Sequence, residues 1–196
     1  MNKGQLLFPI MLVALLLNAP GASGQEESEG KKEVKQSGYI NITEFNFCSG
    51  IGYVKSGTYS ELNDEMSWGI KNISAILASE GTSVGIGIGF DAYENETLMP
   101  VTADMRFKLI KGRYSPVINT CIGYSLGLDT DEKGLTMGIS AGFKAYLSKS
   151  IALMFNIGYK MQEKNVDVVT QYYYFSTVTE EQAKLNFLYL GFAICL

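Results

Sequence analysis

The stretch Leu98–Leu126, LMPVTADMRFKLIKGRYSPVINTCIGYSL, decides the fold of this chain. In its first half, apolar side chains stand at every second position and polar ones lie between them: Met99, Val101, Ala103, Met105, Phe107 and Leu109 against Thr102, Asp104, Arg106 and Lys108. Because alternate side chains of a β-strand point to opposite faces, this pattern predicts a strand with one apolar and one charged face. The alternation resumes at Ile118 after a Lys-Gly turn signal and continues to Leu126, which predicts a β-hairpin.

Two classes of protein contain hairpins of this kind. In a soluble barrel or sandwich, the apolar face packs in the core and the polar face meets water. In an outer-membrane barrel, the apolar face meets lipid and the polar face lines the interior. The alternation in Leu98–Leu126 fits both classes, so the rest of the chain has to distinguish them.

The start of the chain predicts export. It carries a basic residue, an apolar run and small residues suited to cleavage, at Lys3, Leu6–Leu17, Ala22 and Gly24. The run is shorter than the ~20 residues of a typical membrane-spanning helix, so we expect residues 1–24 to be a signal peptide that is removed after Gly24. The charged residues 25–36 are expected to form a periplasmic leader, and residues 37–196 an outer-membrane β-barrel domain.

Eight alternating segments, bounded by turn residues, follow the leader. They are Gly38–Val54, Met66–Leu77, Ser83–Asp91, Leu98–Leu109, Ile118–Leu126, Leu135–Ala145, Ile151–Met161 and, at the chain end, Leu188–Leu196. The second is the least regular, because the parity of its apolar residues changes between Ile70 and Ile73. One extra residue in a strand reverses its faces beyond that point, so we predict a β-bulge near Lys71 or Asn72.

The connections between these segments favour the membrane class. Short turns at 78–82, 111–114 and 147–149 alternate with connections that are mostly longer, at 55–64, 92–97, 127–134 and 163–181. Outer-membrane barrels have short periplasmic turns and longer external loops. If the chain starts in the periplasm, the first set is predicted to be periplasmic and the second set external.

Glycine recurs on the polar faces, at Gly85, Gly87, Gly89, Gly123, Gly138, Gly142, Gly158 and Gly191. Glycine weakens a strand, but in a narrow barrel it makes room for a long side chain from the opposite wall. We therefore predict an all-β fold, an eight-stranded antiparallel up-and-down transmembrane β-barrel with a side-chain-filled lumen.

Six charged residues on the polar faces are predicted to form a lumen charge network: Glu44, Asp104, Arg106, Lys108, Lys144 and Lys160. Their expected role is to neutralise one another, because an unpaired buried charge is costly. A polar binding site or a conducting path is the alternative. Since side chains can fill the interior of an eight-stranded barrel, an open pore is not expected.

The run from Gly69 to Leu128 resembles a known family. Gly85–Tyr93 is a glycine-alternating strand that ends near an aromatic residue and Asp, Leu98–Lys108 carries Pro-Val and then acidic and basic residues, and Lys111–Leu126 contains a turn before Ser-Pro and ends near Gly-Tyr-Ser. This pattern is similar to the small outer-membrane β-barrel proteins of Bacteroides-type bacteria. The resemblance covers most of the chain from about Gly38 onward and implies a Gram-negative outer-membrane barrel whose function is generally unassigned.

The chain departs from outer-membrane barrels at its last residue. Such barrels usually end on an aromatic residue that the insertion machinery recognises, whereas this chain ends on Leu196, with Phe192 further in. The resemblance therefore implies the fold more firmly than it implies efficient insertion.

No catalytic, cofactor or metal site is predicted. The chain has no His, which excludes Ser-His and Cys-His nucleophilic pairs. By the resemblance, barrel proteases, acyltransferases and deacylases need an essential His, so we expect no enzyme. The acidic loop at 129–132 lacks the full ligand pattern of a calcium loop, and Cys48, Cys121 and Cys195 are expected to be free thiols.

The external stretch Val166–Glu181, VDVVTQYYYFSTVTEE, is the strongest functional lead. Its β-branched and aromatic residues predict that the last two strands continue beyond the bilayer as a projecting hairpin. The candidate interaction residues are Tyr172, Tyr173, Tyr174 and Phe175. An open strand edge there can recruit a partner strand by β-augmentation; the alternative is that the aromatic residues anchor the barrel at the lipid interface.

The sequence thus predicts an integral barrel of the bacterial outer membrane with a structural or surface-interaction role through its external loops. Expected partners are outer-membrane lipid, the barrel-assembly machinery acting on the C-terminal strand, and an extracellular protein. The 20 acidic and 16 basic residues give no sign of a nucleic-acid surface. We expect a monomer. The alternative is a secreted soluble β-barrel that binds a small ligand.

Overall fold

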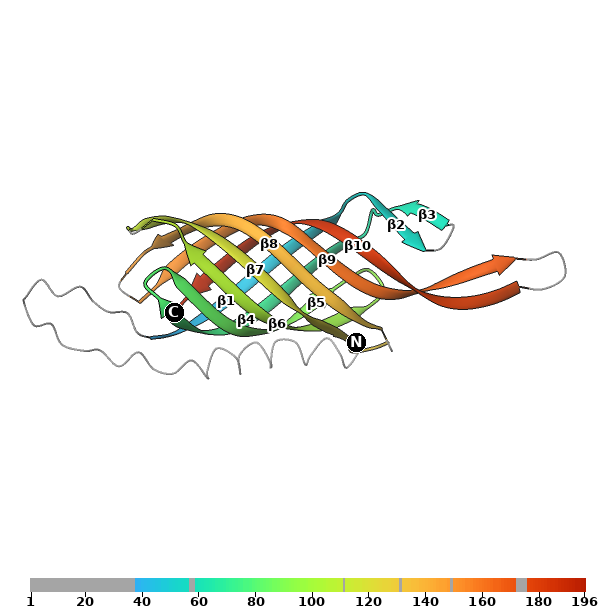
Figure 1. The fold of residues 1–196 in the computed structure, drawn as a ribbon, viewed down its shortest axis with the longest axis horizontal. Helices are drawn as coiled ribbons and strands as arrows, with labels where there is room; N and C mark the ends of the chain where they lie inside the picture. The colour runs from blue at the N-terminus through green and yellow to red at the C-terminus, as the bar shows by residue number, and fades with distance from the viewer. Residues whose placement is uncertain (1–37, 57–58, 111, 131, 149, 172–175) are drawn as a thin grey trace, which may run out of the picture. The chain divides into compact units, whose positions relative to one another are not determined.

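The computed structural model describes residues 38–56, 59–110, 112–130, 132–148, 150–171 and 176–196. Its strands, shown in Figure 1, are β1 Tyr39–Gly50, β2 Tyr53–Ser56, β3 Tyr59–Leu62, β4 Met66–Ser79, β5 Thr82–Ala92, β6 Thr97–Lys108, β7 Tyr114–Gly127, β8 Lys133–Tyr146, β9 Ala152–Gln171 and β10 Ser176–Cys195. The described residues contain no helix that is long and apolar enough to cross a membrane.

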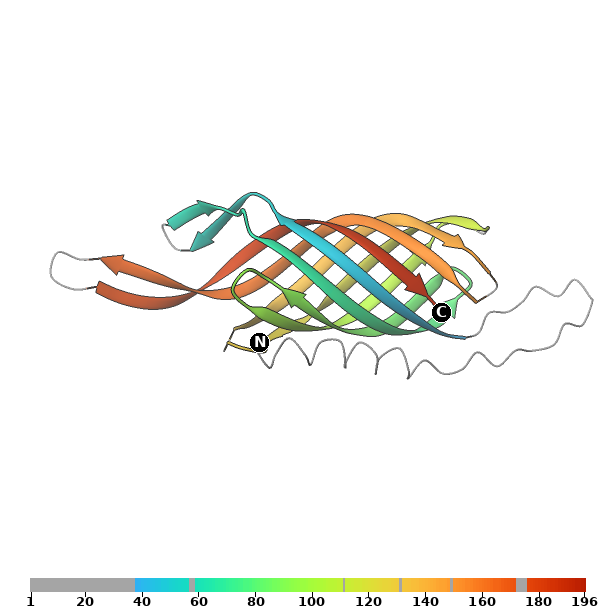
Figure 2. The ribbon, with the colours of Figure 1, turned by 180° about the vertical axis from the view of Figure 1, so that it is seen from behind.

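Eight of these strands form a closed barrel in the order β1-β10-β9-β8-β7-β6-β5-β4, and β2 and β3 form a separate hairpin. Neighbouring barrel strands are antiparallel throughout. The barrel closes where β1 pairs with β10, from Ile42 opposite Cys195 to Gly50 opposite Phe187. The opposite views in Figures 1 and 2 show the strands wrapping around the barrel. The predicted eight-stranded antiparallel up-and-down barrel is confirmed.

The two ends of the barrel differ. The start of β1 and the end of β10 lie at one end, the terminal end, together with the connections 80–81, 109–113 and 147–151. The opposite end, the hairpin end, carries the β2–β3 hairpin, the connections 93–96 and 128–132, the end of β9 and the start of β10. The longer connections at the hairpin end are those that contain paired strands, whereas 93–96 and 128–132 are as short as the terminal turns.

The last two strands continue beyond the barrel as a paired ribbon. β8 pairs with β9 only as far as Gln162, whereas β9 and β10 stay paired up to Gln171 opposite Ser176. We call the described residues 163–171 and 176–186 the projecting hairpin; its two strands are drawn in orange and red in Figure 1. The predicted extension of the last two strands is confirmed, and the candidate interaction residues Tyr172–Phe175 lie outside the described residues.

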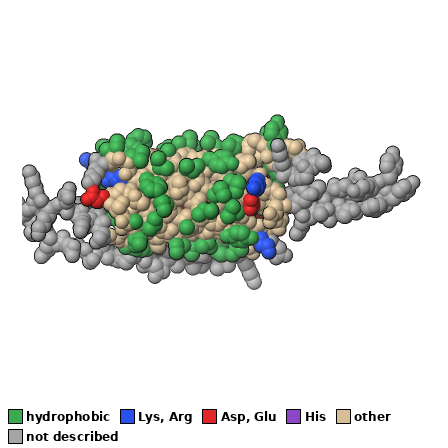
Figure 3. Space-filling model, viewed as in Figure 1, with side chains coloured by type: hydrophobic (Ala, Val, Ile, Leu, Met, Phe, Trp, Pro, Cys, Tyr) green, Lys and Arg blue, Asp and Glu red, His purple; other side chains and the backbone are tan. Residues whose placement is uncertain are grey.

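The outer surface of the barrel is apolar, and charged side chains lie inside it. On β6, Met105 and Phe107 are 40% and 36% exposed, whereas Asp104 and Arg106 between them are 6% and 7% exposed. Large exposed apolar side chains stand on every barrel strand. Figure 3 shows such side chains in patches spread over one face of the barrel, with charged side chains toward its two ends. A soluble β-protein has the reverse arrangement, so this is the pattern expected of a barrel surrounded by lipid.

The β-bulge predicted near Lys71 or Asn72 is wrong. β4 pairs there without a break with both β1 and β5, and its register shift against β5 lies between Leu77 and Ser79. Ile73 therefore faces the interior, where it is fully buried against other apolar residues. The apolar parity changes along β4 because the interior itself changes from polar to apolar toward the terminal end.

The interior glycines are explained by neighbouring strands. An added Cβ on Gly123 would lie 2.0 Å from the carbonyl oxygen of Val101, and one on Gly142 would lie 2.1 Å from that of Phe155. At each of the glycines predicted to line the interior, the atom nearest to an added Cβ belongs to an adjacent strand. The prediction that they make room for side chains from the opposite wall is therefore wrong. The backbones and side chains of adjacent strands lie so close to these glycines that they leave too little space for a Cβ.

We expect Gly123→Ala to destabilise the barrel by about 1–3 kcal/mol, the usual cost of overpacking. The matched control is Gly38→Ala, because nothing lies within 4 Å of an added Cβ at Gly38, and its expected change is within about 0.5 kcal/mol. Urea unfolding of the refolded variants, followed by the emission of the single tryptophan, Trp68, measures both changes. Equal stabilities would contradict the close approach of β6 and β7.

Candidate functional site

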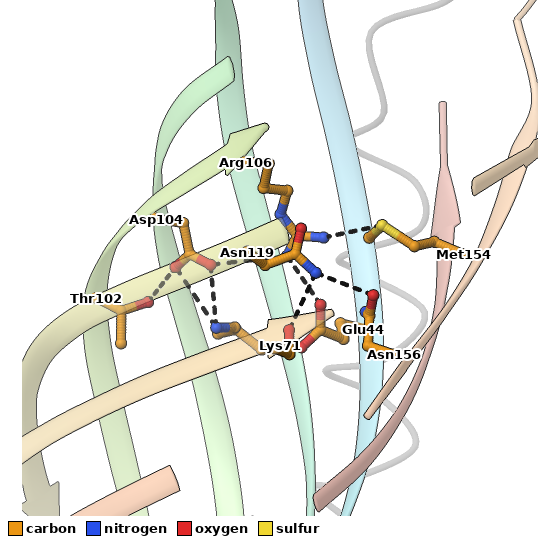
Figure 4. A network of polar contacts seen from close by, with 9 residues as sticks. Glu44, Lys71, Thr102, Asp104, Arg106, Asn119, Met154 and Asn156 are labelled. Atoms are coloured by element: carbon orange, nitrogen blue, oxygen red, sulfur yellow. Dashed lines mark hydrogen bonds and ion pairs between the residues drawn. The ribbon is translucent and has the colours of Figure 1, made fainter. Parts of the chain in front are cut away.

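Four charged side chains from three strands meet in the middle of the barrel interior. Nη2 of Arg106 lies 2.8 Å from Oε2 of Glu44 and 3.6 Å from Oδ1 of Asp104. Nζ of Lys71 lies 3.2 Å from Oδ1 of Asp104. We call Glu44, Lys71, Asp104 and Arg106 the central charge cluster, drawn in Figure 4. Its two positive and two negative charges balance.

The strand register places these four side chains together. Glu44 on β1 stands opposite Lys71 on β4, and Asp104 and Arg106 are two residues apart on β6, so they share its inner face. The four side chains are between 4% and 12% exposed. Thr102 donates a 2.6 Å hydrogen bond to Oδ2 of Asp104. Because an unpaired charge inside a protein costs several kcal/mol, this mutual pairing is what permits all four charges to be buried.

A small cavity lies against the central charge cluster. Its volume is about 10 Å³, which is about the room that one water molecule needs. Besides the cluster, its lining includes Asn119, Cys121 and Tyr189. Asn119 donates hydrogen bonds to Ser140 and Asn156, at 3.2 and 2.9 Å. Small-molecule sites usually measure ~300–1,000 Å³, so this cavity is far too small for a substrate.

Apolar layers lie on both sides of the central charge cluster. Toward the terminal end, the terminal plug consists of Ile42, Ile73, Ala75, Val117, Ala152, Met154, Ala193 and Cys195. Toward the hairpin end, a second layer consists of Cys48, Tyr93, Leu98, Leu185 and Phe187. All of these side chains are buried. The central charge cluster therefore lies between two buried apolar clusters.

Further ion pairs lie nearer to the hairpin end. Nζ of Lys160 lies 2.6 Å from Oδ2 of Asp91. On the projecting hairpin, Nζ of Lys164 lies 2.6 Å from Oε1 of Glu96 and 3.3 Å from Oε1 of Glu65. Burial lowers the pKa of Lys164, but its hydrogen bond to Glu96 and the charge of Glu65 outweigh burial and raise that pKa above its ordinary value. These bonds tie the base of the projecting hairpin to the loops beside it.

The structure brings together only part of the predicted lumen charge network. Glu44, Asp104 and Arg106 meet in the central charge cluster, whereas Lys160 pairs with Asp91. The other two residues, Lys108 and Lys144, lie at the terminal end. Their Nζ atoms are 4.9 and 5.0 Å from the ring centroid of Tyr146.

Sequence reasoning missed Lys71 and Asp91. The bulge predicted near Lys71 left open which face of the strand its side chain occupies. In the structure, β4 alternates there without a break, which places Lys71 inside the barrel. Asp91 has the same parity as Gly85, Gly87 and Gly89, so alternation along Ser83–Asp91 is a signal that could have identified it.

Thiols and acidic side chains are the remaining groups that could bind a metal ion. The described residues contain no group of three or more His, Cys, Asp or Glu residues that could hold a metal ion. Cys48, Cys121 and Cys195 are free thiols, and Cys48 and Cys195 are buried. The charges of the central cluster are paired with one another and enclosed. What the arrangement does physically is to bind β1, β4 and β6 together across the barrel interior.

Comparison with known proteins identifies the fold. No protein-family profile matches the chain, and neither does any curated protein sequence. The structure is similar to Neisserial surface protein A, with 10% identity, a TM-score of 0.51 and coverage of 80% of this chain and 96% of that one. It is also similar to the outer membrane protein OprG from Pseudomonas aeruginosa, with 10% identity, a TM-score of 0.55 and coverage of 82% and 96%. The resemblance to Bacteroides-type barrels stays a prediction, and the chain has the eight-stranded barrel fold of small outer-membrane proteins.

Proposed function

We propose that this protein is an integral, non-catalytic β-barrel of the bacterial outer membrane, with a side-chain-filled lumen and a structural or surface-interaction role through its external hairpins. One observation carries the proposal: large apolar side chains face outward on all barrel strands, while charged side chains are buried inside. In lipid, a closed barrel also satisfies every backbone hydrogen bond. A soluble ligand-binding barrel would need the opposite distribution of side chains.

The two ends support an orientation. The terminal end, with its short turns, fits the periplasmic side, and the hairpin end fits the external side. The barrel-assembly machinery would act on β10, whose outer face carries Phe192 and ends near Leu196. Residues 1–24 would be removed on export.

We expect the protein to fractionate with the outer membrane and to migrate as a compact band in detergent gels that shifts to a slower band after boiling. The physical reason is that a closed barrel resists the detergent until heat unfolds it. Fractionation followed by paired unboiled and boiled gels measures this. Recovery in the aqueous fraction without any band shift would contradict the membrane barrel and favour the soluble alternative.

We expect no stepwise conductance from the reconstituted barrel. The terminal plug and the layer around Phe187 enclose the central charge cluster, so ions meet two buried apolar layers. Planar-bilayer recording, with a general porin at equal protein concentration as the positive control, measures this. Regular, protein-dependent steps would contradict a filled lumen.

The surface role rests on the projecting hairpin. Among the described strands, none pairs with the outer edge of β9 beyond Gln162. An unpaired strand edge presents backbone N–H and C=O groups that can accept another strand. The projecting hairpin therefore offers an edge to an extended segment of an extracellular protein.

Deleting residues 166–181 and closing the hairpin with a two-residue turn tests this role. We expect the variant to keep its band shift, because the barrel pairs end at Gln162 and Phe187. We expect it to lose binding of a labelled peptide that copies residues 176–186, measured by fluorescence anisotropy on vesicles. A variant with Tyr172–Phe175 replaced by serine separates the aromatic residues from the backbone edge. Unchanged peptide binding after the deletion would contradict a role for this edge.

A further inference from the structure

Polar side chains gather at one place on the described outer surface of the barrel. They are Asn41 and Thr43 on β1 and Asn72 and Ser74 on β4. Asn41 stands opposite Ser74, and Thr43 stands opposite Asn72, so the four side chains occupy two adjacent rungs. Asn41 and Thr43 share the outer face of β1 with Phe45, which is 43% exposed. We call these four residues the amide island.

The amide island is bonded within itself. Nδ2 of Asn41 donates to Oδ1 of Asn72 at 3.1 Å, and Nδ2 of Asn72 donates to Oδ1 of Asn41 at 2.9 Å and to Oγ1 of Thr43 at 3.1 Å. The hydroxyls of Tyr39 and Ser74 are 3.0 Å apart. These bonds lower the cost of placing amides in lipid. Thr43 can still donate its hydroxyl proton, and each Oδ1 keeps a second lone pair for a partner.

The depth of the amide island follows from the aromatic residues on the same two strands. Tyr39 near the terminal end and Trp68 toward the hairpin end are 50% and 47% exposed, and such residues mark the two membrane interfaces. A strand that is tilted by about 40° rises about 2.5 Å per residue along the membrane normal. Asn41 then lies about 5 Å and Thr43 about 10 Å inward from Tyr39. The amide island thus extends from the interface, where the Tyr39 hydroxyl contacts Ser74, into the hydrocarbon layer at Thr43.

Apolar side chains surround the amide island at this depth. On β10, Ile194 stands opposite Thr43 and is 36% exposed. On β5, Ile88 and Ile86 stand opposite Asn72 and Ser74 and are 52% and 63% exposed. Apolar side chains thus flank the island on β5 and β10, so a partner reaches its inner rung, Thr43 and Asn72, from within the membrane.

In place of the monomer expected from the sequence, we propose that the amide island is the contact through which two copies of this chain pair side by side in the membrane, an inference that rests on the proposed membrane insertion. A soluble partner does not reach the inner rung of Thr43 and Asn72, and an acyl chain offers no hydrogen bonds. A second copy that is inserted in the same orientation carries the same island at the same depth. A two-fold axis along the membrane normal then places island against island. The island is uncharged and offers both donors and acceptors, so it is complementary to itself.

Disulfide trapping tests the pairing. Ser74→Cys places a thiol in the island, and we expect mild oxidation in outer membranes to give a covalent dimer. The native protein supplies the background: Cys48 and Cys195 are buried, and the partly buried Cys121 lines the interior cavity. Ile139→Cys, at a 54% exposed position on β8, is the matched lipid-facing control and should give no dimer.

A second pair of variants tests whether the amide side chains produce the dimer, as opposed to chance encounters between copies. Asn41→Leu with Asn72→Leu, made in the Ser74→Cys protein, should reduce the trapped dimer by about tenfold. Thr120→Leu, an equally conservative change on β7, should leave it unchanged. A leucine side chain is favourable in lipid, so the heat-dependent band shift should persist and report insertion independently of pairing.

The outcomes are distinct. Loss of the band shift in the native protein would defeat the proposed membrane insertion itself. If the band shift is present but Ser74→Cys yields no more dimer than Ile139→Cys, pairing of copies is overturned. It is equally overturned if the leucine changes do not reduce the dimer, or if Ser74→Cys traps a different membrane protein.

Discussion

Glu44→Leu is expected to lower the free energy of unfolding by about 3–5 kcal/mol, because it leaves an uncompensated charge in the barrel interior. Nη2 of Arg106 loses the oxygen that lies 2.8 Å away. Asp104 cannot replace it fully, because it lies 3.6 Å from the same nitrogen and also pairs with Lys71. Urea unfolding of the barrel in lipid vesicles, followed by Trp68 emission and by the compact gel band, measures the loss.

A charge-balanced variant is the control for this result. Glu44→Leu combined with Arg106→Met removes one charge of each sign and keeps the pair of Lys71 and Asp104. Replacing a buried ion pair with apolar residues of similar volume is often neutral or stabilising, so we expect the double variant to recover most of the lost stability. If the double variant is as unstable as Glu44→Leu alone, the loss comes from packing and not from charge imbalance.

Met105→Arg is expected to impair insertion by about 2–4 kcal/mol, the cost of a basic side chain at the midplane of the lipid face of a barrel. Met105 lies on the outer face of β6 with Val101, Ala103 and Phe107, and it is 40% exposed. The fraction of protein that refolds into lipid vesicles, measured as the compact gel band over a urea series, reports this cost.

Two conservative changes on the same strand bracket the effect. Met105→Leu keeps an apolar side chain toward lipid and should insert normally. Thr102→Ser keeps the hydroxyl that donates to Asp104 and should be nearly silent. Normal insertion of Met105→Arg would mean that the outer face of β6 meets water, which would contradict the membrane barrel.

The fold could be predicted from the sequence because β-strand alternation is a local property. On β6, every second residue from Met99 to Phe107 reports the same face, and neighbouring segments repeat the pattern. The projecting hairpin was predictable for the same reason, since β-branched and aromatic residues continue past the barrel strands. Both features depend only on residues that are close together in the sequence.

The candidate site could be predicted only in part, because it depends on contacts between distant strands. Alternation places Glu44, Asp104 and Arg106 inside, but it does not say at which height each one lies. Lys108 and Lys144 have the right facing, yet the register sets them at the terminal end beside Tyr146. The side chains that line the lumen also change from polar to apolar toward the terminal end. This change makes the alternation of apolar residues along β4 look irregular.

The projecting hairpin has a reach that can be estimated from its backbone alone. From Gln162 to Gln171 the strand advances nine residues, which is about 30 Å at the usual rise of about 3.3 Å per residue. The polar headgroup layer on one side of a bilayer is only about 5–8 Å thick. In the proposed membrane orientation, most of the ribbon would stand clear of the lipid headgroups, so assays of the proposed surface role need probes that are displayed well above the membrane.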